Sequence, residues 1–198
     1  SKNSFRHGDT AKAGEHENMI RAAISILILL MALPARAEPA LLENEFLRAV
    51  FDRRGELISL VDKANGWEVL SGKGNRFILY KDIPSAWDAW DIDSNAALQP
   101  VSTLEPVTID VLSPGPIIAQ LRIGRKISNS TLTQVITLRR GSRSLEFSTT
   151  LDWQEIHRLL KVAFPINLHA SEALHEIQFG YIRRPTHRSR QYDADRFE

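Results

Sequence analysis

Two tryptophans and four aspartates gather in one twelve-residue segment, Asp82–Asp93, which also contains a proline. The faces of indole rings stack on the C–H surfaces of sugars, and carboxylates accept hydrogen bonds from sugar hydroxyls. The segment therefore predicts a saccharide-contacting loop, with its contacts at Trp87, Asp88, Trp90 and Asp91. The alternative interpretation is that the indole rings fill a protein core while the acids face water.

A second group of polar side chains lies near the C-terminal end of the sequence. Residues Glu176–Arg188 run from a predicted strand into a basic loop that contains Arg184 and His187. A histidine there can carry a proton near neutral pH. The alternative is a solvated turn after an edge strand.

The four histidines of residues 38–198 do not predict a metal site. His157, His169, His175 and His187 stand outside any H-E-x-x-H or similarly tight ligand spacing. His7-Gly8-Asp9 is an H-x-D, but it lies in polar sequence with no predicted strand to hold it, so we interpret it as chance. The chain also has no cysteine, which excludes disulfides and thiolate ligands.

Short segments in which polar and apolar residues alternate predict the β-strands that position these residues. In Thr131–Leu138 the side chains of Leu132, Gln134, Ile136 and Leu138 share one face. Nine such strands are predicted: Phe46–Phe51, Glu56–Val61, Arg76–Tyr80, Thr108–Leu112, Ile117–Gly124, Thr131–Leu138, Leu145–Leu151, Leu159–Phe164 and Leu174–Phe179. A turn with Gly55 at positive φ joins the first two. Without long amphipathic helices, the pattern predicts an all-β, antiparallel β-sandwich rather than a parallel α/β core.

Charge and the N-terminal sequence limit the function classes. The formal net charge of the 198 residues is +1, which argues against a nucleic-acid-binding protein. Residues 1–18 predict a disordered or non-native tail. Residues 19–37 combine a basic start, a 12-residue apolar stretch and Ala35-Arg36-Ala37, as in a secretory signal peptide, although a buried helix is the alternative. We expect residues 38–198 to be secreted or periplasmic if this segment is used, and cytoplasmic otherwise.

Six ordered blocks make the sequence resemble the C-terminal region of the α-mannosidases of glycoside hydrolase family 38. They are Leu42–Phe46, Ser59–Lys63, Trp87–Asp93, His157–Pro165, Glu176–Gly180 and Arg184–His187. The resemblance covers about Leu41 to Glu198 and implies a mutarotase-like supersandwich. It also implies that the chain is a fragment, incomplete at both ends, of an enzyme that hydrolyses terminal α-mannosides. The zinc ligands and the aspartate nucleophile of that family lie in an N-terminal barrel that the resemblance does not include.

The resemblance also implies roles for the candidate residues. Trp87, Asp88, Trp90 and Asp91 would shape the sugar pocket, and Arg184 and His187 would support it. The implied partners are an α-mannoside or mannose-containing oligosaccharide and the catalytic barrel, with no cofactor in this chain and zinc in the barrel. Tyr181 stands where the family commonly has a histidine. A stand-alone secreted carbohydrate-binding module and a non-functional gene remnant remain the alternatives.

Overall fold

The computed structural model describes residues 39–88, 92–93, 95–101, 107–187 and 189. The chain divides into two units, Ser1–Ala37 and Glu38–Glu198. The predicted tail and signal-like segment lie outside the described residues. The described part of the second unit consists of strands and one short 3-10 helix, η1 (Ala96–Leu98), which confirms the predicted all-β class. None of the helical segments in the described ranges is long and apolar enough to cross a membrane.

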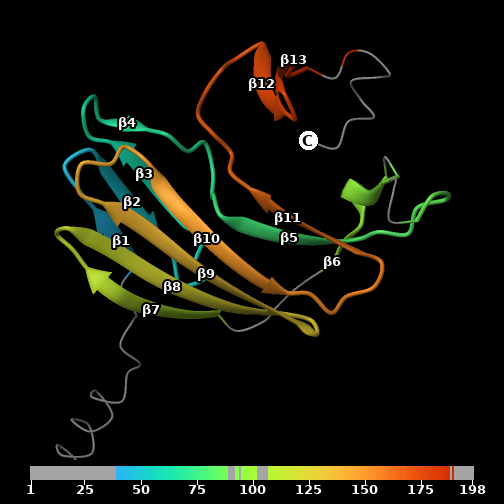
Figure 1. Ribbon diagram of the computed structural model, residues 1–198, viewed down its shortest axis with the longest axis horizontal. Coiled ribbons are helices and arrows are strands. Elements are labelled where there is room, and N and C mark those ends of the chain that lie inside the picture. Colours follow the sequence, from blue (N-terminus) through green and yellow to red (C-terminus); the bar gives the residue numbers. More distant parts are fainter. Residues whose placement is uncertain (1–38, 89–91, 94, 102–106, 188, 190–198) are drawn as a thin grey trace, which may run out of the picture. The chain divides into compact units, whose positions relative to one another are not determined.

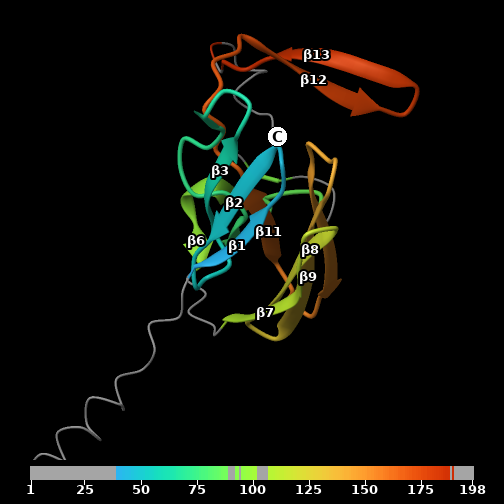
Figure 2. The ribbon, with the colours of Figure 1, turned by 90° about the vertical axis from the view of Figure 1, so that its left-hand side faces the viewer.

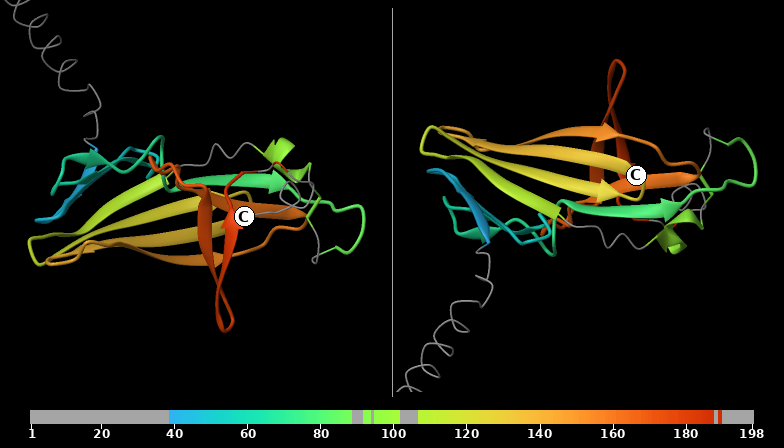
Figure 3. Two further views of the ribbon diagram at one scale, coloured as in Figure 1. Left: turned by 90° about the horizontal axis from the view of Figure 1, so that it is seen from above. Right: turned by 90° about the horizontal axis from the view of Figure 1, so that it is seen from below.

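Two antiparallel four-stranded sheets form the sandwich (Figures 1 and 3). The first has the order β1-β2-β3-β4, made of β1 (Ala40–Glu43), β2 (Leu47–Phe51), β3 (Leu57–Asp62) and β4 (Trp67–Glu68). The second has the order β10-β9-β8-β7, made of β7 (Val107–Pro114), β8 (Ile118–Ile127), β9 (Ser130–Arg139) and β10 (Leu145–Asp152). Because consecutive strands are neighbours in both sheets, short turns connect them.

Two smaller antiparallel groups complete the described strands. β5 (Arg76–Lys81) pairs on one side with β11 (Arg158–Ala163) and on the other with β6 (Pro100–Val101). β12 (Glu172–Ile177) and β13 (Gly180–Pro185) form a hairpin. Figure 2 shows this hairpin reaching past the edges of both four-stranded sheets. Its large apolar side chains are exposed, among them Leu174 and Tyr181, so the hairpin contributes little to the core.

The main core lies between the two four-stranded sheets. Phe51 and Leu57 from the first sheet and Leu121, Ile123 and Ile136 from the second are almost completely buried in one cluster. A smaller cluster joins Leu79 of β5 to Ile127 and Leu132 of the β8–β9 hairpin. The long β8–β9 hairpin therefore contributes to both clusters and connects them.

The alternation predicted for β9 is confirmed, including its polar member. Gln134 is 2% exposed and lies on the same buried face as Leu132 and Ile136. Its side-chain oxygen accepts a hydrogen bond from Asn75 Nδ2 at 2.7 Å, and its Nε2 donates to Thr149 Oγ1 at 3.0 Å. These bonds satisfy a side chain that would otherwise be costly to bury.

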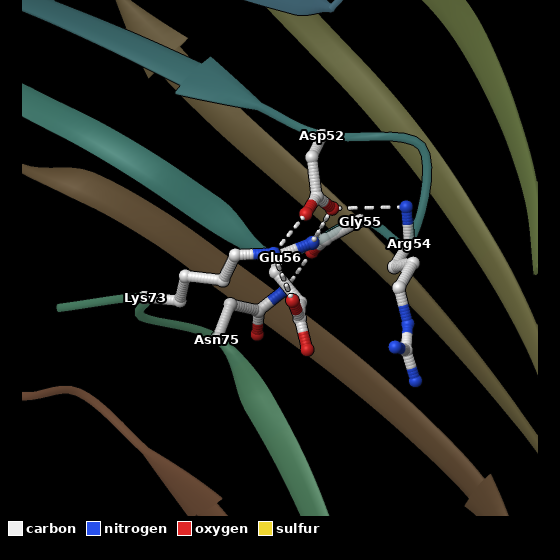
Figure 4. A network of polar contacts seen from close by, with 6 residues as sticks. All are labelled: Asp52, Arg54, Gly55, Glu56, Lys73 and Asn75. Carbon is white, nitrogen blue, oxygen red and sulfur yellow. Dashed lines mark hydrogen bonds and ion pairs between the residues drawn. The ribbon is translucent and has the colours of Figure 1, made fainter.

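A tight turn at Asp52–Glu56 joins β2 to β3 (Figure 4). Asp52 Oδ1 accepts hydrogen bonds from the backbone N–H groups of Arg54 at 2.9 Å and Glu56 at 3.0 Å. Lys73 Nζ lies 2.7 Å from Asp52 Oδ2 and 2.9 Å from Glu56 Oε2. Gly55 has a φ of +66°, as the sequence predicted, and its carbonyl accepts a bond from Asn75 Nδ2. The turn is thus fixed by its own aspartate and by neighbouring polar groups.

The Asp52 carboxylate makes folding stability sensitive to acid. Burial alone would raise the pKa of Asp52, but the hydrogen bonds from Lys73, Glu56 and Arg54 outweigh burial and hold the pKa below its ordinary value. A pKa that is lower in the folded state gives stability above the unfolded-state pKa that is lost as the pH falls through the folded-state pKa. We therefore expect Asp52→Asn to flatten the fall of the unfolding free energy below about pH 4.

Urea titrations between neutral and acidic pH measure this effect. Asp110→Asn, on an exposed position of β7, removes a carboxylate that takes no part in the turn and serves as the control. An acid-induced loss of stability as steep in Asp52→Asn as in the parent chain would contradict the role given to this carboxylate.

The nine predicted strands all exist, with ends shifted by a few residues, and four further short strands accompany them. One expectation is wrong. The segment after Phe179 is not a basic loop, because Gly180–Pro185 forms β13 and pairs with β12. Arg183 is exposed and Arg184 half-buried on this strand, so the hairpin has no apolar face that alternation would reveal.

Candidate functional site

The candidate site begins where β5 ends. The antiparallel pairing sets Lys81 opposite Arg158, so the start of the Asp82–Asp93 segment lies beside the start of β11. The backbone N–H of Asp82 donates to the carbonyl oxygen of His157 at 3.0 Å. Two segments far apart in the sequence therefore meet at one end of this sheet.

A cavity of about 190 Å³ lies between the end of β5 and the η1 segment. Its lining residues are Lys81, Asp82, Ile83, Asp93, Asn95, Ala96 and Gln99. Asp93 accepts hydrogen bonds from the backbone N–H and the hydroxyl of Ser85, both at 3.1 Å, so these two residues lie side by side. Asp82 Oδ1 is a buried oxygen for which the described part of the chain supplies no hydrogen-bond donor. The cavity thus has carboxylate acceptors and one cation at its edge, a set suited to hydroxyl groups.

Trp87 lies on the exposed side of this segment. Its side chain is 75% exposed, so it does not fill the core, and its contact with a saccharide stays a prediction. By contrast, Trp153 packs against the smaller core cluster. Trp90 and Asp91, the other predicted contacts of the segment, lie outside the described residues.

Asp88 approaches a histidine that the sequence reading had not assigned to the site. Asp88 Oδ1 lies 3.8 Å from His157 Nδ1, close enough for an ion pair when the imidazole is protonated. Both Trp87 and His157 have positive φ angles, +60° and +52°, which are unusual for residues other than glycine. Such backbone conformations cost energy and gather at functional sites. The structure therefore adds His157 to the candidate site.

Arg184 and His187 lie elsewhere. Arg184 is opposite Ala173 in the β12–β13 hairpin, and His187 follows the end of β13, where its Nδ1 is 2.7 Å from Ser189 Oγ. Figures 1 and 3 show this hairpin apart from the loop that follows β5. The structure brings Asp88 to His157 but does not bring these two predicted supporting residues to the same loop.

No metal centre is found in the described ranges. No three histidine, aspartate or glutamate side chains of these ranges gather closely enough to hold an ion. The described side chains of the site offer hydrogen bonding through carboxylates and stacking on Trp87.

A family model matches all of the described strands except the start of β1. The model described as "Glycosyl hydrolases family 38 C-terminal domain" matches residues 42–198. The chain belongs to this family. The match to this family 38 domain includes all strands from β2 onward and the candidate site, and it confirms the resemblance seen in the six sequence blocks.

Known proteins of similar sequence carry α-mannosidase names. The family 38 domain is 38% identical over 165 residues to the human protein "Alpha-mannosidase 2C1" and 35% identical over 166 residues to "Alpha-mannosidase G" of Dictyostelium discoideum. It is 28% identical over 173 residues to "Alpha-mannosidase" of Saccharomyces cerevisiae. These alignments cover 79%, 80% and 79% of this chain, but only 16%, 15% and 16% of those proteins.

Proposed function

We propose that this family 38 domain provides carbohydrate-contacting surface to an α-mannosidase. The observation that carries the proposal is the exposed Trp87 beside the acidic cavity that follows β5, within a chain whose relatives carry α-mannosidase names. The indole would cover an apolar sugar face while Asp82, Asp93 and Asp88 accept hydroxyl hydrogen bonds. Mannose-containing saccharides are the proposed ligands.

In this proposal the bond-breaking groups belong to another part of the enzyme. Glycoside hydrolysis requires a nucleophile and an acid in one geometry, with a metal where the family uses one. We assign the zinc ion and the aspartate nucleophile to the catalytic barrel that the family implies. The residues of this chain orient the saccharide, and the Asp88–His157 pair keeps the loop close to the start of β11.

Replacing Trp87 tests the proposal. Methyl α-mannoside should quench the tryptophan fluorescence of the chain saturably, because the exposed Trp87 is at the proposed sugar site. We expect Trp87→Ala to weaken binding about 2- to 13-fold, the factor that corresponds to a lost aromatic contact of about 0.5–1.5 kcal/mol. Trp67→Ala removes a partly exposed indole from β4 and is the matched control. Equal binding by both variants would contradict the assignment, as would quenching that never saturates.

The alternative of a stand-alone binding module differs in one measurable way. Such a module would bind a mannoside with an affinity that does not change when the catalytic part of the enzyme is added. In our proposal the affinity rises when the catalytic part of the enzyme is added in trans, because it would complete the sugar pocket.

A further inference from the structure

A second cavity lies beneath the β2–β3 turn, away from the loop that follows β5. Its volume is about 130 Å³, and four basic residues line it: Arg53, Arg54, Arg125 and Lys126. Glu56 is the one acid among its lining residues. The apolar part of the wall comes from β5, β7, β8 and β11. Positive charge therefore concentrates around a small, partly enclosed space.

Arg125 is half-buried, whereas the other three cations are exposed. Its guanidinium carbon lies 5.1 Å from the centre of the Phe77 ring. A Cβ atom placed on Gly55 would lie 2.8 Å from Arg125 Nη2, so the backbone of the turn is directly against the guanidinium. The Nε and Nη2 atoms are both buried, and neither has a hydrogen-bond partner in the described part of the chain.

Buried donors without acceptors are costly, and those of a charged group are the most costly. Burial lowers the pKa of Arg125, although the charges of Glu56 and Asp52 oppose that change. Neither acid makes a described hydrogen bond with Arg125. Lys73 instead holds Asp52 Oδ2 at 2.7 Å and Glu56 Oε2 at 2.9 Å (Figure 4). The negative charges of Asp52 and Glu56 thus act on Arg125, but their ion pairs are with Lys73.

We propose that this cavity binds a small oxyanion, a phosphate or carboxylate group, which Arg125 recognises. The Nε and Nη2 groups of a guanidinium form one edge with two parallel donors, the arrangement that fits two oxygens of a carboxylate or phosphate. Arg54 and Lys126 are exposed at the cavity and add attraction for an anion. The inference is independent of sugar binding at the other cavity.

Titrating the full chain with sodium phosphate at constant ionic strength, set with sodium chloride, tests the proposal. The Nε–H resonance of Arg125, assigned by its loss in Arg125→Lys, should shift saturably. Arg125→Lys keeps the charge but loses the two-donor edge, so we expect the affinity measured from backbone amides to fall about 10-fold or more. Arg122→Gln removes a cation from an exposed position of the same strand and should leave binding unchanged.

Substitutions at the two exposed cations of the cavity, Arg54 and Lys126, test the proposal without changing Arg125. Arg54→Gln and Lys126→Gln should each weaken binding about 2- to 5-fold, as expected for exposed charges. A parallel titration with acetate distinguishes the source: phosphate binding alone indicates a phosphate group, and acetate binding indicates a carboxylate such as a protein side chain. An unmoved Arg125 resonance with both anions would overturn the proposal, as would equal weakening by Arg122→Gln and Lys126→Gln.

Discussion

Phe51→Ala should lower the free energy of unfolding by about 3–5 kcal/mol, the usual cost of truncating a fully buried phenylalanine. The Phe51 side chain is 0% exposed and belongs to the cluster between the two four-stranded sheets. Its neighbours Leu121, Ile123 and Ile136 come from β8 and β9, which cannot close the space without moving a long hairpin. Urea unfolding followed by circular dichroism measures the loss.

Phe179→Ala is the matched control for this truncation. Phe179 lies in the turn between β12 and β13 and is fully exposed, at 102% of its reference area. The same chemical change there should alter the unfolding free energy by less than about 0.5 kcal/mol. Similar losses from both variants would mean that the hairpin packs as part of the core, contrary to the fold described above.

Gly55→Ala should destabilise the chain by about 2–5 kcal/mol, the sum of a left-handed backbone penalty and overpacking. The new Cβ would lie 2.8 Å from Arg125 Nη2 and 2.9 Å from two carbon atoms of Ile123. Ile123 is fully buried, so it has little space into which to move. Thermal and urea denaturation of the variant measure the effect.

Gly66→Ala separates the two causes. Gly66 has a nearly identical φ of +68°, but a Cβ there would meet nothing within 4 Å. Its substitution should cost only the backbone term of about 1–2 kcal/mol. If the two alanine variants are equally unstable, the close approach of the turn to β8 is not what requires glycine at position 55.

The alternating patterns predicted the strands well because one face of each sheet is buried. Leu132, Gln134 and Ile136 are on the predicted face of β9. The partner of Gln134 was not predictable, because Asn75 is 59 residues away and reaches it only after β5 packs against the sandwich. An alternating pattern identifies a buried position, but it does not identify the residue that forms hydrogen bonds with a polar side chain there.

The candidate site was predicted only in part for a related reason. The segment Asp82–Asp93 stands out by composition, whereas His157 joins it only through the antiparallel register of β5 and β11. Arg125 was missed because the predicted strand ended at Gly124 and because the nitrogen atoms of an arginine are rarely buried without a partner. In each case the missing information was a contact between segments far apart in the sequence, which a local pattern does not contain.

Chemical-shift mapping with methyl α-mannoside tests the central claim most directly, that this family 38 domain contacts saccharide through the loop after β5. The account predicts saturable shifts of the backbone amides of Asp82, Trp87, Asp88 and His157, and their loss in Trp87→Ala. Shifts confined to the opposite part of the sandwich, for example around Gly66 and Trp67, would contradict it, and so would a spectrum that the sugar leaves unchanged.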